Sequence, residues 1–191
     1  TIIMNLNEIK NIENIPGLSE GTALNMLEAA VVCLCRQQHN SGVSMPISGV
    51  QNYNQVLEWD TLFTNTLDRA YADQEVATEL GAVCISILIA LSITPYTIIE
   101  RSRKKTGFDY WLGDKNATLP FVHSARLEIS GIFDNLLQPE NIWPILYVDD
   151  TSKLLKSNDI ILLQPSNILF IFLTDDVSKL LKSTDVNLLQ P

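Results

Sequence analysis

The chain has 191 residues, of which 46% are apolar and 18% are charged, and its formal net charge is −9. This length allows one compact domain with a small appendage, and this balance excludes an intrinsically disordered chain. The negative net charge repels polyanions. Binding to nucleic acid therefore requires a local basic site, a metal ion or a partner subunit.

Cysteine content and the absence of a targeting signal favour a cytoplasmic protein. Three cysteines are an odd number, in a chain too large to need disulfide staples. No signal-peptide pattern opens the sequence. The longest apolar run, residues 82–93, is shorter than the ~20 residues that span a bilayer. We therefore expect a buried helix segment there and no membrane association.

The first half of the chain predicts two helices separated by a weak strand. Ser19 is typical of an N-cap, and apolar residues recur at helical spacing over residues 22–38. Residues 42–49 contain a proline and indicate at most an edge strand. A longer helix is predicted over residues 67–91, before a Thr-Pro pair. Its expected buried side consists of Val76, Leu80, Val83, Cys84, Ile87 and Leu91.

Three strands are expected after the second helix, because β-branched and aromatic residues are dense there. They cover residues 96–100, 108–112 and 125–131. The polar residues 101–107 form a hairpin connection between the first two. Alternation in the third strand places Leu127 and Ile129 on one face and Glu128 on the other.

The last third of the chain contains a tandem repeat. Residues 135–160 and 161–186 share one 26-residue frame with LLQP, an apolar run, an Asp-Asp pair and a lysine-rich segment. Each unit is expected to form a strand, at residues 142–148 and 168–173. A short helix should follow each strand, with the acidic pair at its start. Units of this kind stack on one another.

The order of these elements predicts an α/β (or α+β) fold, a mixed sheet flanked by the two longer helices. An αβββ core forms a main domain over residues 1–134, and the repeat units of residues 135–191 pack on or beside it. The alternative is a rearranged sequence, in which the repeat tail has replaced an original final helix and strand.

Two acidic residues lie in adjacent predicted strands, Asp109 in GFDYWLG and Glu128 in ARLEISG. If both face one side, their oxygens can bind a divalent cation, and Glu79 (or Glu75) on the preceding helix supplies a third ligand. Such a cation activates water for phosphodiester hydrolysis. The alternative is that these acids are solvated or paired with nearby arginines.

The predicted hairpin contains the densest basic cluster in the chain. Its members are Arg101, Arg103, Lys104 and Lys105. These side chains can contact phosphates while Tyr110 or Trp111 stacks on a base. The alternative is a solvated hairpin turn without a ligand.

The helix and the three strands resemble the PD-(D/E)xK nuclease superfamily, whose members share an αβββαβ core and cut DNA or RNA with Mg²⁺. The resemblance covers residues 67–132 and rests on Glu79, Asp109 and Glu128. It implies that these acids bind Mg²⁺ and that the hairpin of residues 101–105 binds nucleic acid. The same segment also resembles uncharacterised bacterial proteins.

The chain departs from that family at one position. The family usually has a lysine two residues after the glutamate, where this chain has Ser130. Either Lys104 or Lys105 substitutes, which makes Asp109, Glu128 and Lys105 the catalytic residues, or the site is inactive. The rival hypothesis is a non-catalytic protein that binds a protein partner through its acidic surface and repeat units.

Overall fold

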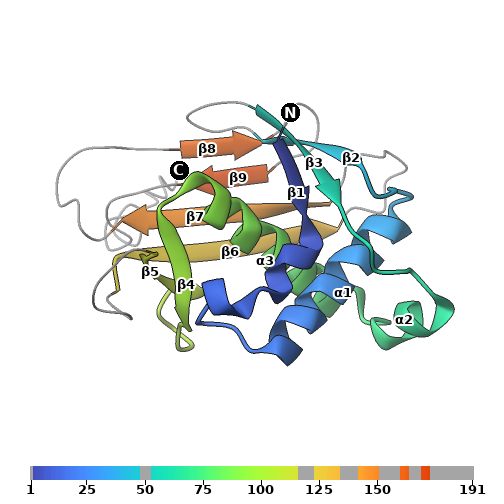
Figure 1. Cartoon of the computed structure of the whole chain (residues 1–191), viewed down its shortest axis with the longest axis horizontal. Helices are drawn as coiled ribbons and strands as arrows, with labels where there is room; N and C mark the ends of the chain where they lie inside the picture. The colour runs from blue at the N-terminus through green and yellow to red at the C-terminus, as the bar shows by residue number, and fades with distance from the viewer. Residues whose placement is uncertain are drawn as a thin grey trace, which may run out of the picture.

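The computed structural model describes residues 2–47, 53–115, 123–133, 142–150, 160–163 and 169–172, the last three ranges by their backbone. In this part of the chain, helices and sheets form an α+β fold (Figure 1). The fold class expected from the order of the elements is therefore confirmed.

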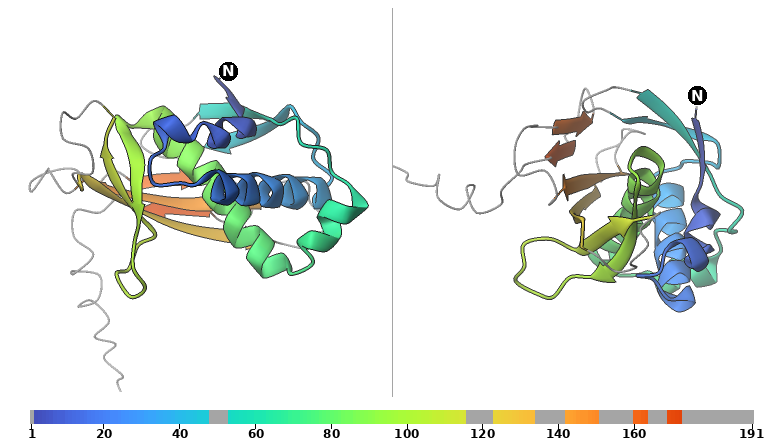
Figure 2. Two further views of the ribbon diagram at one scale, coloured as in Figure 1. Left: turned by 60° about the horizontal axis from the view of Figure 1, so that its bottom comes forward. Right: turned by 60° about the vertical axis from the view of Figure 1, so that its left-hand side comes forward.

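Two long helices lie at the centre of the fold. α1 (Glu20–Arg36) begins after Ser19, whose hydroxyl accepts the Thr22 N–H at 3.2 Å, so the predicted N-cap is confirmed. α3 (Gln74–Ile93) begins after Asp73, whose carboxylate accepts N–H groups of the first helical turn. The two helices pack against each other, as Figure 2 shows.

The prediction of a single helix over residues 67–91 is wrong at the start of this range. The structure has a separate helix there, α2 (Asn65–Ala70), and the chain leaves helical geometry at Tyr71. The Arg36 guanidinium explains the break. It forms an ion pair with the Asp68 carboxylate at 2.8 Å and donates to the carbonyl oxygens of Asp68 and Tyr71. These carbonyls at the end of α2 are thereby satisfied without a further helical turn.

The second half of α3 is enclosed on most sides, as its apolar sequence predicted. Every residue from Gly81 to Ala90 is buried. Val76, which the sequence placed on the buried side, is instead 49% exposed. The length and apolarity of α3 would also suit a membrane span. However, 67% of its most apolar window is buried inside the protein, which is typical of a core helix.

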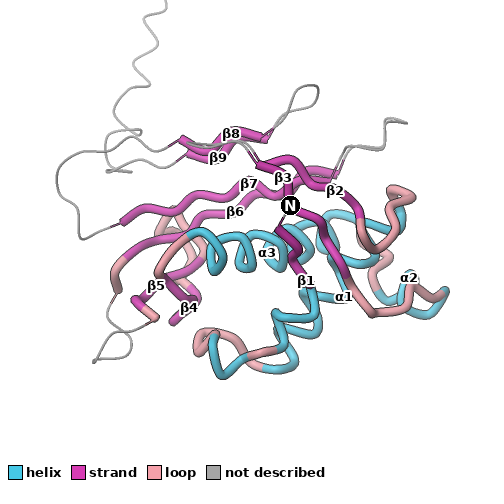
Figure 3. The backbone as a smooth tube through the Cα atoms, turned by 45° about the horizontal axis from the view of Figure 1, so that its top comes forward, coloured by secondary structure: helices cyan, strands magenta, loops and turns pink. Residues whose placement is uncertain are grey.

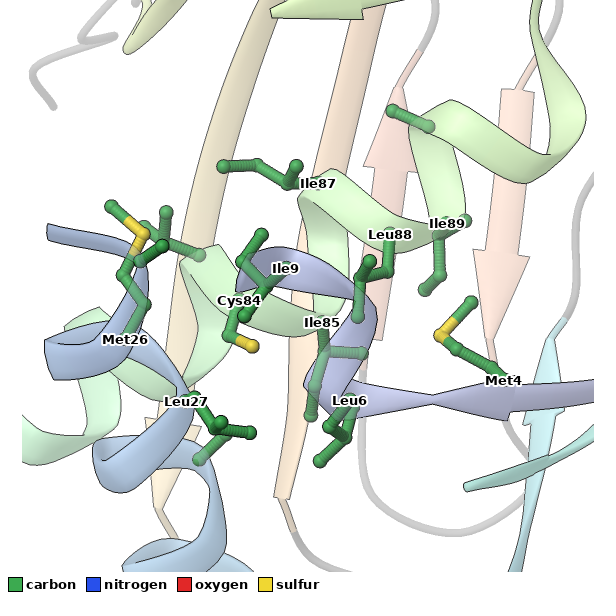
Figure 4. Packing of buried hydrophobic residues seen from close by; sticks show 14 of the residues in the cluster. Met4, Leu6, Ile9, Met26, Leu27, Cys84, Ile85, Ile87, Leu88 and Ile89 are labelled. Atoms are coloured by element: carbon green, nitrogen blue, oxygen red, sulfur yellow. The ribbon is translucent and has the colours of Figure 1, made fainter. Parts of the chain in front are cut away.

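The main core lies where both helices meet the N-terminal segment. The 3₁₀ helix η1 (Leu6–Lys10) places two fully buried side chains against α1 and α3, and a second 3₁₀ turn, η2 (Ile12–Asn14), follows it. Figure 4 shows side chains from these elements pointing toward one another, among them Leu6, Ile9, Met26, Leu27, Cys84 and Ile85. This apolar contact fixes the position of α3.

A three-stranded sheet, called here the N-terminal sheet, packs on the same core. It consists of β1 (Ile2–Asn5), β3 (Tyr53–Glu58) and β2 (Val43–Ile47), in that spatial order. β1 runs parallel to β3, and β2 runs antiparallel to it. β2 lies at the edge and contains Pro46, in agreement with the prediction of an edge strand. β1 and β3 were not predicted.

A four-stranded antiparallel sheet, called here the main sheet, packs along α3 (Figure 3). Its strands are β4 (Tyr96–Arg101), β5 (Tyr110–Asp114), β6 (Ala125–Phe133) and β7 (Ile142–Asp150), in chain order. The three strands predicted after the second helix are therefore confirmed, although the middle one begins at Tyr110 instead of Phe108.

The repeat tail contributes strands at the predicted places. β7 comes from the first unit and β9 (Leu169–Phe172) from the second, where it pairs with β8 (Ile160–Leu163). Asp149 and Asp150, the acidic pair of the first unit, are the last residues of β7 and pair with β6. The two predicted helices of the tail lie outside the described residues.

The free edge of β4 is covered by the N-terminal segment. The Gly17 N–H donates to the Ile98 carbonyl at 2.9 Å, and a Cβ on Gly17 would lie 2.8 Å from the carbonyl carbon of Ile99. The register with β5 shifts between Ile98 and Glu100 at the same place. After this bulge, Glu100 and Arg101 are exposed at the end of the strand.

The contact between α3 and β6 yields the first prediction. A Cβ on Gly131 would lie 2.7 Å from the Ala82 Cβ and 2.9 Å from the Thr78 carbonyl oxygen. We expect Gly131→Ala to lower the free energy of unfolding by about 1–3 kcal/mol in urea titrations, because helix and strand must separate. Gly21→Ala is the control. Its Cβ would meet nothing within 4 Å, so equal or higher stability is expected.

Candidate functional site

Asp109 is held between two strands at the end of the main sheet. It precedes β5, its N–H donates to the Leu127 carbonyl at 2.8 Å, and its carbonyl accepts the Ser102 N–H at 2.7 Å. Its carboxylate oxygen Oδ2 accepts the Ile129 N–H at 2.7 Å. The side chain thus bonds β6 beyond the last paired residue of β5, and this fixes the carboxylate at the sheet end.

Electrostatic effects show that Asp109 lies near both other predicted acids. Burial raises the pKa of the Asp109 carboxyl above its ordinary value; the Ile129 hydrogen bond and the Arg101 charge oppose this, and the Glu79 charge adds to it. Desolvation also raises the pKa of Glu128, and the Asp109 charge raises it further. The structure therefore places Asp109 within electrostatic reach of Glu79 and of Glu128.

The two glutamates approach Asp109 from opposite faces of the main sheet. Leu127 is fully buried on the face that α3 covers, whereas Glu128 is exposed on the outer face, as alternation predicted. Glu79 belongs to α3 itself and is exposed beside the inner face. This arrangement explains why, among the described residues, no three His, Cys, Asp or Glu side chains form a group that could hold a metal ion.

A hydrated Mg²⁺ makes smaller demands on the protein than a closed cage of ligands. It is usually held by one or two carboxylates and keeps several waters. The Asp109 oxygen that does not bind Ile129 and the exposed Glu128 carboxylate suit this mode. Asp109 and Glu128 would be the residues that hold such an ion, and Glu79 would add an outer negative charge.

The prediction that Tyr110 can stack on a base is wrong. Its ring is only 2% exposed and faces the core, where Leu127 is its partner on β6. Burial raises the pKa of the Tyr110 hydroxyl, which the Arg101 charge opposes, and the charges of Asp109 and Glu79 raise it further. The tyrosine is therefore part of the inner side of the acid cluster.

The basic hairpin is well ordered by its own hydrogen bonds. The Thr106 hydroxyl donates to the Arg103 carbonyl at 2.9 Å, and the Ser102 hydroxyl donates to the Phe108 carbonyl. This turn holds Lys105 at φ 76°, in the left-handed region that a lysine rarely adopts. The four predicted phosphate contacts are all exposed: Arg101, Arg103, Lys104 and Lys105.

Arg101 is the hairpin cation whose charge reaches Asp109. It is the register partner of Tyr110 and so shares the inner face with that residue. The exposed Ser130 lies on the outer face, two residues after Glu128, where the resemblance called for a lysine. The assignment of Lys105 as a catalytic substitute stays a prediction.

The sequence did not predict an aromatic cluster on the outer face. The Trp111 and His123 rings are stacked with centroids 4.2 Å apart and planes at 6°, and Phe108 meets Trp111 edge-on at 4.6 Å. The Arg126 guanidinium lies 5.6 Å from the centroids of Phe108 and Trp111. The Glu100 carboxylate lies 3.2 Å from His123.

Protein-family models, curated proteins and solved structures include none that matches this chain.

The Asp109 side chain yields the second prediction. Asp109→Ala removes the acceptor of the Ile129 N–H and leaves a partly buried donor unsatisfied, so we expect a loss of about 1–3 kcal/mol in the free energy of unfolding. Asp109→Asn keeps an acceptor oxygen and should lose less. Amide hydrogen exchange at Ile129 should be faster in the alanine variant only. Equal exchange in both variants would contradict this role.

A third prediction concerns pH. Because the folded state raises the pKa of Glu128, the stability that this group contributes is present below its unfolded pKa, ~4.3, and is lost as the pH rises through the folded value. We expect Glu128→Gln to raise the thermal midpoint at pH 7, with a smaller difference at pH 4. Circular dichroism melts measure this, and a larger difference at pH 4 would contradict it.

Proposed function

We propose that this chain is a nuclease-like domain that binds Mg²⁺ and phosphodiesters where the main sheet meets the start of α3. One observation supports this proposal above the others. The Asp109 carboxylate lies in the combined field of Glu79 and Arg101, and Glu128 lies in the field of Asp109. Acidic side chains that could bind Mg²⁺ therefore lie next to a basic side chain, Arg101, that could bind a phosphate.

Burial is the main cause that raises the pKa values of Asp109 and Glu128, and a neighbouring acid raises each of them further. Like charges that are partly desolvated cost free energy, and a bound divalent cation offsets this cost. When bound, Mg²⁺ would polarise the phosphodiester and lower the pKa of a coordinated water. The hairpin cations Arg103 and Lys104 would hold the neighbouring phosphates.

The proposed activity depends on a cation that takes the place of the family lysine. Lys105 of the hairpin is the predicted substitute, and Arg101 is a second candidate because its charge already acts on Asp109. If neither Lys105 nor Arg101 takes over the role of the family lysine, the domain binds phosphodiesters without cleaving them.

The alternative function is a non-catalytic protein that binds a protein partner through its acidic surface and its repeat units. Two observations favour it. One Asp109 oxygen is already engaged by a backbone N–H, and Ser130 cannot supply the positive charge of a lysine. The net charge of −9 suits a basic protein partner.

A Mg²⁺ titration tests the proposal. We expect isothermal calorimetry to show binding by the wild-type chain, and Mg²⁺ at 100 times its dissociation constant should stabilise it by about 2.7 kcal/mol. Asp109→Asn should lose both effects. Glu13→Gln, an exposed acid of the N-terminal segment, is the matched control and should keep them.

Cleavage is measured with the same proteins on plasmid and on single-stranded substrates. Mg²⁺-dependent cleavage that Asp109→Asn abolishes supports the enzyme. Absence of both Mg²⁺ binding and cleavage in the wild-type chain would overturn the proposed function and leave the protein-binding alternative.

A further inference from the structure

The repeat tail contains the same strand segment twice. β7 belongs to the first unit and β9 to the second, and 26 residues separate equivalent positions of the two units. In this frame, Leu169–Phe172 of β9 corresponds to residues 143–146 of β7. Both stretches directly follow Asn-Ile, and both are followed by two residues and then Asp-Asp. The chain therefore contains two candidates for one place in the main sheet.

That place is the edge of β6. Residues 143–146 of β7 lie opposite residues 129–132 of β6 in an antiparallel register. The hydrogen bonds of such a ladder join backbone groups, so a second strand in the same register can form them as well. β9 has Leu, Phe, Ile and Phe at the equivalent positions, and these residue types are common in strands. Two strands with one frame favour alternate pairing.

The two strands differ at the position opposite Gly131. β7 has Pro144 there, which has no N–H to donate to a neighbouring strand, and prolines are rare inside sheets for this reason. The equivalent residue of β9 is Phe170, which keeps its N–H. Its larger side chain opposes the exchange, because Gly131 lies on the face that packs closely on α3. The two effects have opposite signs, so this position does not select one strand alone.

β9 lies one strand away from the edge of β6. It contacts β7, and Figure 1 shows the two strands side by side. Among the described strands, β9 pairs with β8 alone. The ladder with β8 uses one edge of β9, so its second edge can pair with β6 while the pairing of β8 with β9 is kept.

The length of the connection decides which strand prevails. β6 reaches β7 through residues 134–141, and it would reach the equivalent position of the second unit through residues 134–167. A loop about four times as long lowers the probability of closure roughly ninefold. We therefore expect β7 at the edge of β6 in most molecules and β9 in a minority.

We propose that β6 exchanges its partner between the two repeat strands, with β7 in the major state and β9 in the minor state of one chain. The incoming strand comes from the same chain, because a tethered segment has an effective concentration in the millimolar range, far above that of a second chain at micromolar concentration. The exchange changes the last strand of the main sheet and leaves β4, β5 and β6 paired. It therefore does not depend on the proposed Mg²⁺ site.

Disulfide trapping in the full chain tests the exchange. Ser130 is the register partner of Ile145, and Ile171 is the equivalent residue of the second unit. Ser130→Cys is combined with Ile145→Cys in one variant and with Ile171→Cys in another, and both are oxidised with glutathione. Directly opposed residues are close enough for a disulfide. We expect both pairs to crosslink within one chain, the second about ninefold more slowly, in proportion to its population.

Mass spectrometry of tryptic peptides identifies each disulfide, and non-reducing gels separate monomers from dimers. All variants carry Cys35→Ser, because the other native thiols, Cys33 and Cys84, are buried. The matched control combines Ser130→Cys with Phe170→Cys. Neighbouring residues of a strand point to opposite faces, so this pair should stay reduced.

A proline in β7 shifts the exchange in a predictable direction. Ile145→Pro removes a further backbone donor from β7 and leaves β9 unchanged. Added to the variant with Ser130→Cys and Ile171→Cys, it should speed the crosslink between positions 130 and 171.

Three results would each overturn the inference. The first is the absence of a disulfide between positions 130 and 171, or its formation only between two chains. The second is equal crosslinking of positions 170 and 171 to position 130. The third is a crosslinking rate that Ile145→Pro leaves unchanged or lowers. Each of these results leaves the Mg²⁺ proposal intact, because calorimetry tests that proposal separately.

Discussion

The close contact between α3 and β6 is the constraint on which the rest of the structure depends. Gly131 allows the strand to approach Thr78 and Ala82 at distances that no larger residue tolerates. This contact, together with the burial of α3 on most of its sides, fixes the helix against the sheet. Glu79 follows Thr78 directly, so the same contact brings its charge to the sheet end that holds Asp109.

The Asp109 side chain has both a structural role and a role in the proposed cation site. One of its oxygens extends the pairing of β5 and β6 through Ile129, and its charge lies among those of Glu79, Arg101 and Glu128. Desolvation of these acids costs free energy that a divalent cation would offset. In the proposed site, a bound cation would stabilise the ionised sheet end, and acids with raised pKa values are common at functional sites.

Local sequence signals predicted the N-cap at Ser19, the strands of the main sheet and the placement of Glu128 on the opposite face from Leu127. They did not predict features that depend on distant partners. The break before α3 follows from Arg36, and β1 exists only through its parallel pairing with β3. Alternation could place Glu128 on a face but could not tell which face α3 covers. The stack of His123 on Trp111 depends on the register of β5 with β6.

The most direct test of the central claim is paramagnetic broadening of backbone amide signals by Mn²⁺, used in place of Mg²⁺. The account predicts that substoichiometric Mn²⁺ selectively broadens the amides of Asp109, Glu128 and Ile129, and that Asp109→Asn removes this effect. Broadening centred elsewhere in the chain, or no selective broadening in the wild-type protein, would contradict a cation site at the end of the main sheet.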